Sequence, residues 1–152
     1  MLTVQLDGWI KRKKEKKNSK LSEKGYTLRS GGADGADSAF EKGAKKKEVF
    51  YANDCTNDAM STVDIYHPAP DRLSNYAKKL MGRNAMQILG KDLNSPVAFV
   101  VCWTPDGCIS DDERSISTGG TGQAISIASK NNIPVFNLQR KDHLKRIEEF
   151  IK

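Results

Sequence analysis

The feature that most constrains the fold is one continuous apolar run, Val97-Ala98-Phe99-Val100-Val101-Cys102-Trp103. A strand buried on both faces of a parallel sheet has such an unbroken run, whereas a half-exposed strand alternates apolar and polar residues. The run therefore predicts a central strand in an α/β protein whose sheet is covered by helices on both faces.

Short β-like segments alternate with helical segments from Gly25 onward. Strands are predicted over residues 26–29, 48–51, 97–103 and 133–138. Helices are predicted over 36–43, from Pro70 to Gly90 with Tyr76 in the apolar stripe, after Gly122, and over the last residues. Residues 52–69 are polar and lack a period, so they are expected to form a long loop. This order predicts a Rossmann-like three-layer sandwich with a mostly parallel sheet.

Two glycine clusters lie where a predicted strand passes into a helix: Ser30-Gly31-Gly32-Ala33-Asp34-Gly35 and Gly119-Gly120-Thr121-Gly122. Glycines let the backbone approach a ligand, and the following helix offers unpaired N–H groups and the positive end of its dipole. Ligands of parallel sheets bind beyond the carboxyl ends of the strands. Both loops are therefore expected to line one crevice that holds a phosphate, although a glycine pair alone usually serves only a tight turn.

Other side chains near these loops have two interpretations each. Arg83 is either a surface arginine or a clamp on the phosphate. Asp34 or Asp37 either caps the first helix or accepts a hydrogen bond from a ribose hydroxyl. Trp103 either belongs to the core or stacks on a base.

The same residues carry a family resemblance. The segment 30–37, with Gly43-Ala44 downstream, resembles the glycine motif of the DNA-processing-protein-A (Smf) family. Met81-x-Arg83-Asn84, followed by the apolar strand and Thr118-Gly119-Gly120-Thr121-Gly122, resembles the Lonely Guy family. Both belong to the SLOG superfamily of Rossmann-like domains. The chain is most similar to its small stand-alone members, from Lys24 to Leu138.

The resemblance implies a nucleotide-binding domain over 25–152, preceded by a variable basic segment over 1–24, and a homo-oligomer. Leu2, Val4 and Leu6 alternate as in a strand, but the Gly-Ser-Arg turn that follows the first strand of the superfamily is missing. The implied ligand or phosphate contacts are Ser30, Gly31, Gly32, Asp34, Gly35, Asp37, Arg83, Asn84, Trp103, Thr104, Gly119, Gly120, Thr121, Gly122 and Gln123.

The expected function is to bind, sense or sequester a nucleotide or a nucleotide-derived phosphate compound. The alternatives are a nucleotide-processing hydrolase of the Lonely Guy type and a single-strand DNA-binding module of the Smf type. The hydrolase is disfavoured because Ser126 stands where that family has its catalytic glutamate, and a serine cannot replace the carboxylate.

The charged residues, the cysteines and the lack of a long apolar run limit the partners and the location that are expected for the protein. The net charge of +6 is concentrated in a basic run from Lys11 to Lys20, interpreted as a solvated face or arm, with nucleic-acid binding as the alternative. Asp106, Asp111, Asp112 and Glu113 are interpreted as a solvated loop, with a divalent cation beside the phosphate as the alternative. The three cysteines predict no disulfide framework and no zinc site. Without a secretory signal or a run of about 20 apolar residues, a cytoplasmic protein with no membrane contact is expected.

Overall fold

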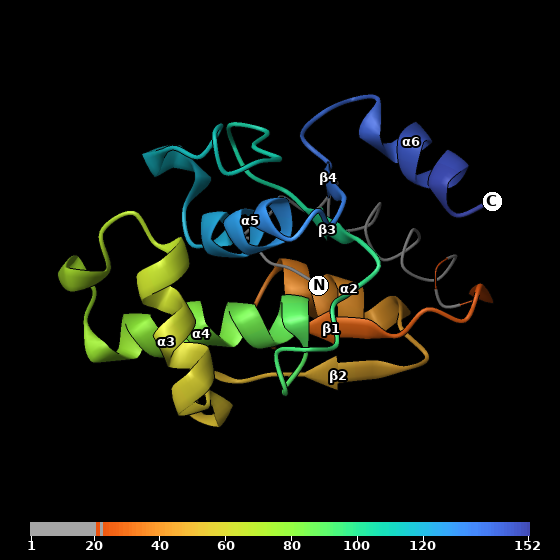
Figure 1. Cartoon of the computed structure of the whole chain (residues 1–152). Coiled ribbons are helices and arrows are strands. Elements are labelled where there is room, and N and C mark those ends of the chain that lie inside the picture. Colours follow the sequence, from red (N-terminus) through yellow and green to blue (C-terminus); the bar gives the residue numbers. More distant parts are fainter. Residues whose placement is uncertain (1–20, 22) are drawn as a thin grey trace.

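The computed structural model describes residue 21 and residues 23–152. The basic run Lys11–Lys20 and the alternating residues Leu2, Val4 and Leu6, for which the sequence made predictions, lie outside this part. Figure 1 shows a mixed α/β arrangement in which α4 and α5 lie side by side, with the strands next to their ends. In the described part, no helix is long and apolar enough to cross a membrane.

The described residues contain four short strands and five α-helices. The strands are β1 (Leu28–Ser30), β2 (Lys47–Val49), β3 (Val100–Cys102) and β4 (Val135–Asn137). The α-helices are α2 (Ala36–Gly43), α3 (Asn57–Tyr66), α4 (Asn75–Leu89), α5 (Thr121–Lys130) and α6 (His143–Phe150). Three single-turn 3₁₀ helices lie at Ala52–Asp54, Pro70–Arg72 and Ile116–Thr118.

The strands pair in two separate parallel pairs within the described part. β1 pairs with β2, with Leu28 opposite Lys47, and β3 pairs with β4, with Val100 opposite Val135. The predicted parallel direction is therefore confirmed, but one continuous sheet in a three-layer sandwich is not. β3 is shorter than predicted because the chain before it bonds to the end of α4, where Val97 N donates to Ile88 O at 2.8 Å.

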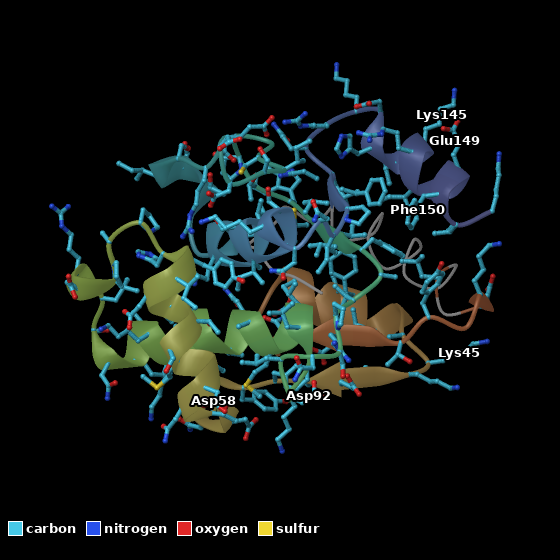
Figure 2. The ribbon with its side chains drawn as sticks, in the orientation of Figure 1. Lys45, Asp58, Asp92, Lys145, Glu149 and Phe150 are labelled. Carbon is cyan, nitrogen blue, oxygen red and sulfur yellow. The ribbon has the colours of Figure 1, made fainter. Side chains whose placement is uncertain are left out.

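The two pairs of strands share one core. Leu28 of β1, Val101 of β3 and Phe136 of β4 are buried in a single apolar cluster with Phe40 and Ile147. Figure 2 shows Phe150 on the side of α6 that faces the strands, and its ring packs edge-on against Phe99 and Phe136. A second cluster buries α5 between α4 and β3.

The expected long loop over residues 52–69 is wrong, because α3 occupies most of it. Thr56 caps this helix, and its hydroxyl accepts a hydrogen bond from Ala59 N at 3.2 Å. Ala59, Thr62 and Val63 form the buried face. These residues are small and partly polar, so the stripe at helical spacing has little hydrophobic contrast.

The next helix begins later than predicted. Pro70–Arg72 forms only a 3₁₀ turn, and α4 starts after Ser74, whose hydroxyl accepts from Ala77 N at 3.1 Å. Tyr76, predicted in the apolar stripe, is 63% exposed. The helix ends as predicted at Gly90, whose φ of +86° suits glycine.

Candidate functional site

Helix α4 is the element on which both glycine loops rest. Its residues from Gly82 to Ile88 are all buried. A Cβ atom on Gly82 would lie 2.6 Å from Cys55 Sγ and 3.0 Å from Ala59 O, so only glycine lets α3 approach this closely. The following residues, Arg83 and Asn84, each contact one of the two loops.

The first glycine loop is held by a carboxylate of the protein itself. Asp37 is fully buried, and its Oδ2 accepts hydrogen bonds from Gly31 N and Ala33 N, each at 3.2 Å. Gly32 N donates to Ser30 Oγ at 3.2 Å. The loop amides that the sequence assigned to a bound anion are therefore satisfied internally in this structure. Asp37 does not cap α2, as one of its two interpretations held, and in this structure its carboxylate holds the loop.

The side chain of Arg83 contacts the first glycine loop from α4. Its side chain is 8% exposed, and Nη1 donates to Gly31 O at 2.9 Å. Burial lowers the pKa of Arg83 against the opposing effect of the nearby Asp37 carboxylate, and arginine remains a cation at neutral pH. Its Nε atom is buried without a hydrogen-bond partner. Such a donor requires a partner that a ligand or an internal water would supply.

A cavity of about 320 Å³ opens beside Arg83. We call it the Arg83 cavity; it is lined by Gly31, Gly32, Ala33, Tyr51, Ala52, Asn53, Tyr76, Leu80 and Arg83. Its volume lies at the lower end of the range typical of small-molecule sites. Tyr51 and Tyr76 are 54% and 63% exposed, so a large part of each side chain is accessible.

The second glycine loop meets α4 one residue further along. Asn84 Nδ2 donates to Gly120 O at 3.2 Å, and Thr118, which precedes the loop, donates to Asp106 Oδ2 at 2.5 Å. Gly119 has a φ of +66°. A Cβ on Gly122 would lie 2.7 Å from Arg114 Nε, so this glycine makes room for an arginine of the protein.

A larger cavity, of about 600 Å³, borders this second loop. We call it the Arg114 cavity; it is lined by Ile65, Tyr66, His67, Pro68, Asp111, Arg114, Ser115, Ile116, Gly119 and Lys130. It shares no lining residue with the Arg83 cavity. The structure therefore brings both glycine loops to one helix but gives each loop its own cavity, where the sequence predicted a single crevice.

Unpartnered polar atoms gather between the two loops. Among the described residues, the buried side-chain atoms without a hydrogen bond are Arg83 Nε, Asn84 Oδ1, both amide atoms of Gln87, and Gln123 Nε2. Arg83, Asn84 and Gln87 share an arc of about 100° on α4, because residues three and four apart lie on the same face. Gln123 lies in α5, one turn after the Gly120 carbonyl that Asn84 contacts.

The other predicted residues have different positions. Asp34 is exposed and Trp103 partly buried, and neither lines a cavity described above. Thr104 is buried, where its Oγ1 accepts from Asn137 Nδ2 at 2.7 Å. Gly35 is the N-cap of α2, with a φ of +98°. Thr121 is buried in the first turn of α5.

The acidic stretch is divided among several contacts. Glu113 pairs with Arg140 at 2.7 Å and Asp111 pairs with Lys130 at 3.4 Å. Asp106 accepts from the Thr118 and Ser115 hydroxyls and from Cys108 N. No three His, Cys, Asp or Glu side chains of the described residues are placed to hold a metal ion.

Sequence reasoning missed two groups of cavity residues. Tyr51 lies two residues beyond the end of β2 at Val49, so the rule that ligands bind beyond strand ends could have found it. Tyr66, His67 and Arg114 come from α3 and from the loop before the second glycine cluster, and no local motif links them.

No family model matches the chain, and no curated protein or solved structure matches it.

Proposed function

We propose that this protein binds a nucleotide, or a nucleotide-derived phosphate compound, in the Arg83 cavity. The observation that carries the proposal is the buried Arg83 guanidinium, which lines the cavity and has an unpartnered Nε. Arginine suits phosphate because its planar fork can donate two parallel hydrogen bonds to two phosphate oxygens. Gly31 and Gly32 leave space for a ligand to approach the backbone.

The proposal includes a fold of the Rossmann-like type, with a three-layer sandwich related to SLOG domains. Its support is the parallel direction of both strand pairs and the glycine loop that follows β1 and leads into α2. A second glycine loop leads into α5 in the same way. The sequence resemblance adds the ligand class, which the comparisons do not supply.

Asp37 sets a limit on the affinity of this site. Its carboxylate lies beside Arg83, since both come within about 3 Å of the same point, the position of a Cβ on Gly31. The pair has no net charge, so attraction of a phosphate depends on direct hydrogen bonds more than on the field of the site. An aromatic contact would then contribute much of the binding energy.

Tyr51 and Tyr76 provide this contact. Both residues line the cavity and are more than half exposed. Their side chains therefore have apolar surface that the protein itself does not cover. Stacking of a base on an aromatic side chain contributes about 1–3 kcal/mol. A mononucleotide, with its phosphate at Arg83 and its base at the tyrosines, uses both features of the cavity.

Calorimetric titration of the full chain with AMP tests the proposal. Arg83→Gln should weaken binding about 10-fold or more, because a hydrogen bond to a charged group contributes about 1.5–3 kcal/mol. Arg72→Gln removes an exposed arginine that lines neither cavity and should leave the affinity unchanged.

Arg83 also holds Gly31, so a loss of binding in Arg83→Gln could reflect a disturbed loop. Tyr76→Ala, on an exposed position, separates the two effects: it should weaken AMP binding while the circular dichroism and melting temperature stay unchanged. The proposal is wrong if the wild-type protein binds no nucleotide at millimolar concentration, or if both variants bind AMP as tightly as the wild type.

A further inference from the structure

The Arg114 cavity has the composition of a second ligand site, independent of the first. It extends along α5, with Gly119 before the start of this helix and Lys130 at its end. A ten-residue helix is about 15 Å long. Of its three charged lining residues, the sequence assigned no ligand to Arg114 or Lys130, and Asp111 entered only in the alternative of a divalent cation.

Arg114 is fixed in place by contacts on one side. Its Nη1 donates to Tyr66 O at 3.0 Å, to Ser126 Oγ at 3.1 Å and to Gln123 Oε1 at 3.4 Å. The guanidinium also lies against Gly122 in the first turn of α5. An arginine beside a helix N-terminus combines a fixed cation with the partial positive charge of the helix dipole, which favours an anion.

The two side chains of α5 that hold Arg114 are themselves buried. Gln123 is fully buried, and while its Oε1 faces Arg114, its Nε2 has no hydrogen-bond partner. Gln123 is not among the residues that line the Arg114 cavity, so its contact with Arg114 positions the guanidinium and does not itself reach a ligand there. Its neighbour Ser126, one turn on, is buried as well.

Asp111 gives the cavity a hydrogen-bond acceptor near Lys130. Its Oδ2 lies 3.4 Å from Lys130 Nζ. The hydrogen bond with Ser126 lowers the pKa of Asp111, and Lys130 and Arg114 lower it further against the opposing effect of burial. Asp111 is therefore a carboxylate at neutral pH and accepts hydrogen bonds from hydroxyl groups.

His67 gives the Arg114 cavity an uncharged hydrogen-bond donor. Its Nδ1 accepts from Ala69 N at 3.1 Å, which leaves the proton on Nε2 in the neutral ring. Burial lowers the pKa of His67, and the positive charge of Arg114 lowers it further. With His67 neutral, the charged lining residues sum to one positive charge.

We infer that the Arg114 cavity binds a sugar phosphate. Its phosphate lies between Arg114 and the start of α5 at Gly119, and its hydroxyl groups donate to Asp111. A phosphate alone would leave the carboxylate unused, and an uncharged sugar would leave the arginine unused. The cavity volume of about 600 Å³ accommodates a pentose or hexose phosphate.

Titration of the ¹⁵N-labelled full chain with ribose 5-phosphate, followed by amide chemical shifts, tests the inference. The amides of Gly119, Gly122 and Ser115 should shift and saturate. Arg114→Gln should weaken this binding about 10-fold or more, whereas Arg72→Gln should not change it.

Two further variants test which side chains of the cavity contact the sugar phosphate. Asp111→Asn should weaken ribose 5-phosphate relative to inorganic phosphate, because the sugar hydroxyls lose their acceptor while the loss of a negative charge favours both anions. Lys130→Gln, at a side chain that is 45% exposed, should weaken binding without altering the fold. The inference is overturned if the Gly119 region does not respond at millimolar ligand, if Arg114→Gln binds normally, or if inorganic phosphate binds as tightly as the sugar phosphate.

The same spectra keep this inference separate from the proposed function. Binding of AMP in the Arg83 cavity is followed by the amides of Gly31, Gly32 and Ala33, none of which lines the Arg114 cavity. Either set of shifts can be absent while the other is present, so failure at one site leaves the result at the other intact.

Discussion

Replacement of Gly32 by alanine should destabilise the protein through the backbone of the first glycine loop. Gly32 has a φ of +65°, a conformation that disfavours any residue with a Cβ by about 1–2 kcal/mol. The added Cβ would lie 2.5 Å from Tyr51 Cε1 and 3.0 Å from Val49 Cγ1. The Tyr51 ring is 54% exposed and can turn outward, so the contact with it adds little to the backbone term.

The second glycine loop offers a matched control of opposite sign. Gly120 has helical angles, φ −62° and ψ −26°, and a Cβ there would meet only Met81 Cε at 3.6 Å. Gly120→Ala restricts the unfolded chain without strain in the folded one, so it should stabilise the protein by about 0.4–1 kcal/mol.

Thermal unfolding followed by circular dichroism measures both effects. A domain of this size loses about 2–4 °C in Tm for each kcal/mol, so Gly32→Ala should melt about 2–8 °C below the wild type. Gly120→Ala should melt at or above the wild-type temperature. Equal melting temperatures for the two variants, or the reverse order, would refute the backbone argument and the loop conformation on which it rests.

Three further predictions concern buried and titrating groups. Asp37→Asn should destabilise the protein by about 3 kcal/mol in urea unfolding, because Arg83 loses its buried counter-charge; an unchanged midpoint would contradict this role. Burial raises the pKa of Asp106, but the hydrogen bonds to its carboxylate, led by that from Thr118, have the larger effect and lower the pKa to about 2. Its contribution, about 1 kcal/mol once solvent screening is allowed for, is present above pH 4 and lost as the pH falls toward 2, a loss that Asp106→Asn should abolish in acid titrations. Chromatography should detect no adenine released from AMP, since Ser126 supplies no carboxylate; adenine that grows in proportion to the protein would show the opposite.

The helices after the glycine loops were predictable because two local signals coincide there. Ala36 and Thr121 begin helices where a glycine cluster precedes an apolar stripe. α3 was missed because its buried face consists of small residues, Ala59 among them, whose burial depends on the close approach of α4 at Gly82. Such an approach is a tertiary contact, and no pattern within residues 52–69 encodes it.

The separation of the strands into two pairs has a similar origin. The apolar run over 97–103 indicated a buried strand, and Val100–Cys102 is fully buried. Its first residue, Val97, instead donates its backbone N–H to Ile88 O at the end of α4, and Ser95, just before the run, donates to Leu89 O. Hydrophobicity predicts burial, but it does not predict which backbone partner a buried segment finds.

The sequence predicted the candidate site only for residues that contact one of the two glycine loops. Arg83 and Asn84, which the family resemblance singled out as ligand contacts, each contact one of the two loops. Asp37 could not be assigned, because a carboxylate near a glycine loop serves equally well as an internal acceptor or a ligand contact. Arg114 could not be found at all, because its contacts to Tyr66 and Ser126 join segments far apart in the chain.

The contact between α3 and α4 at Gly82 restricts how the protein can respond to a ligand. With Cys55 Sγ and the Ala59 carbonyl against its backbone, α4 cannot rotate about its axis without a steric clash. The backbone of Arg83 and Asn84, which follow directly, is therefore held in one orientation. Any closure over a ligand has to come from the loops above the helix, and its amplitude is set by the glycines in them.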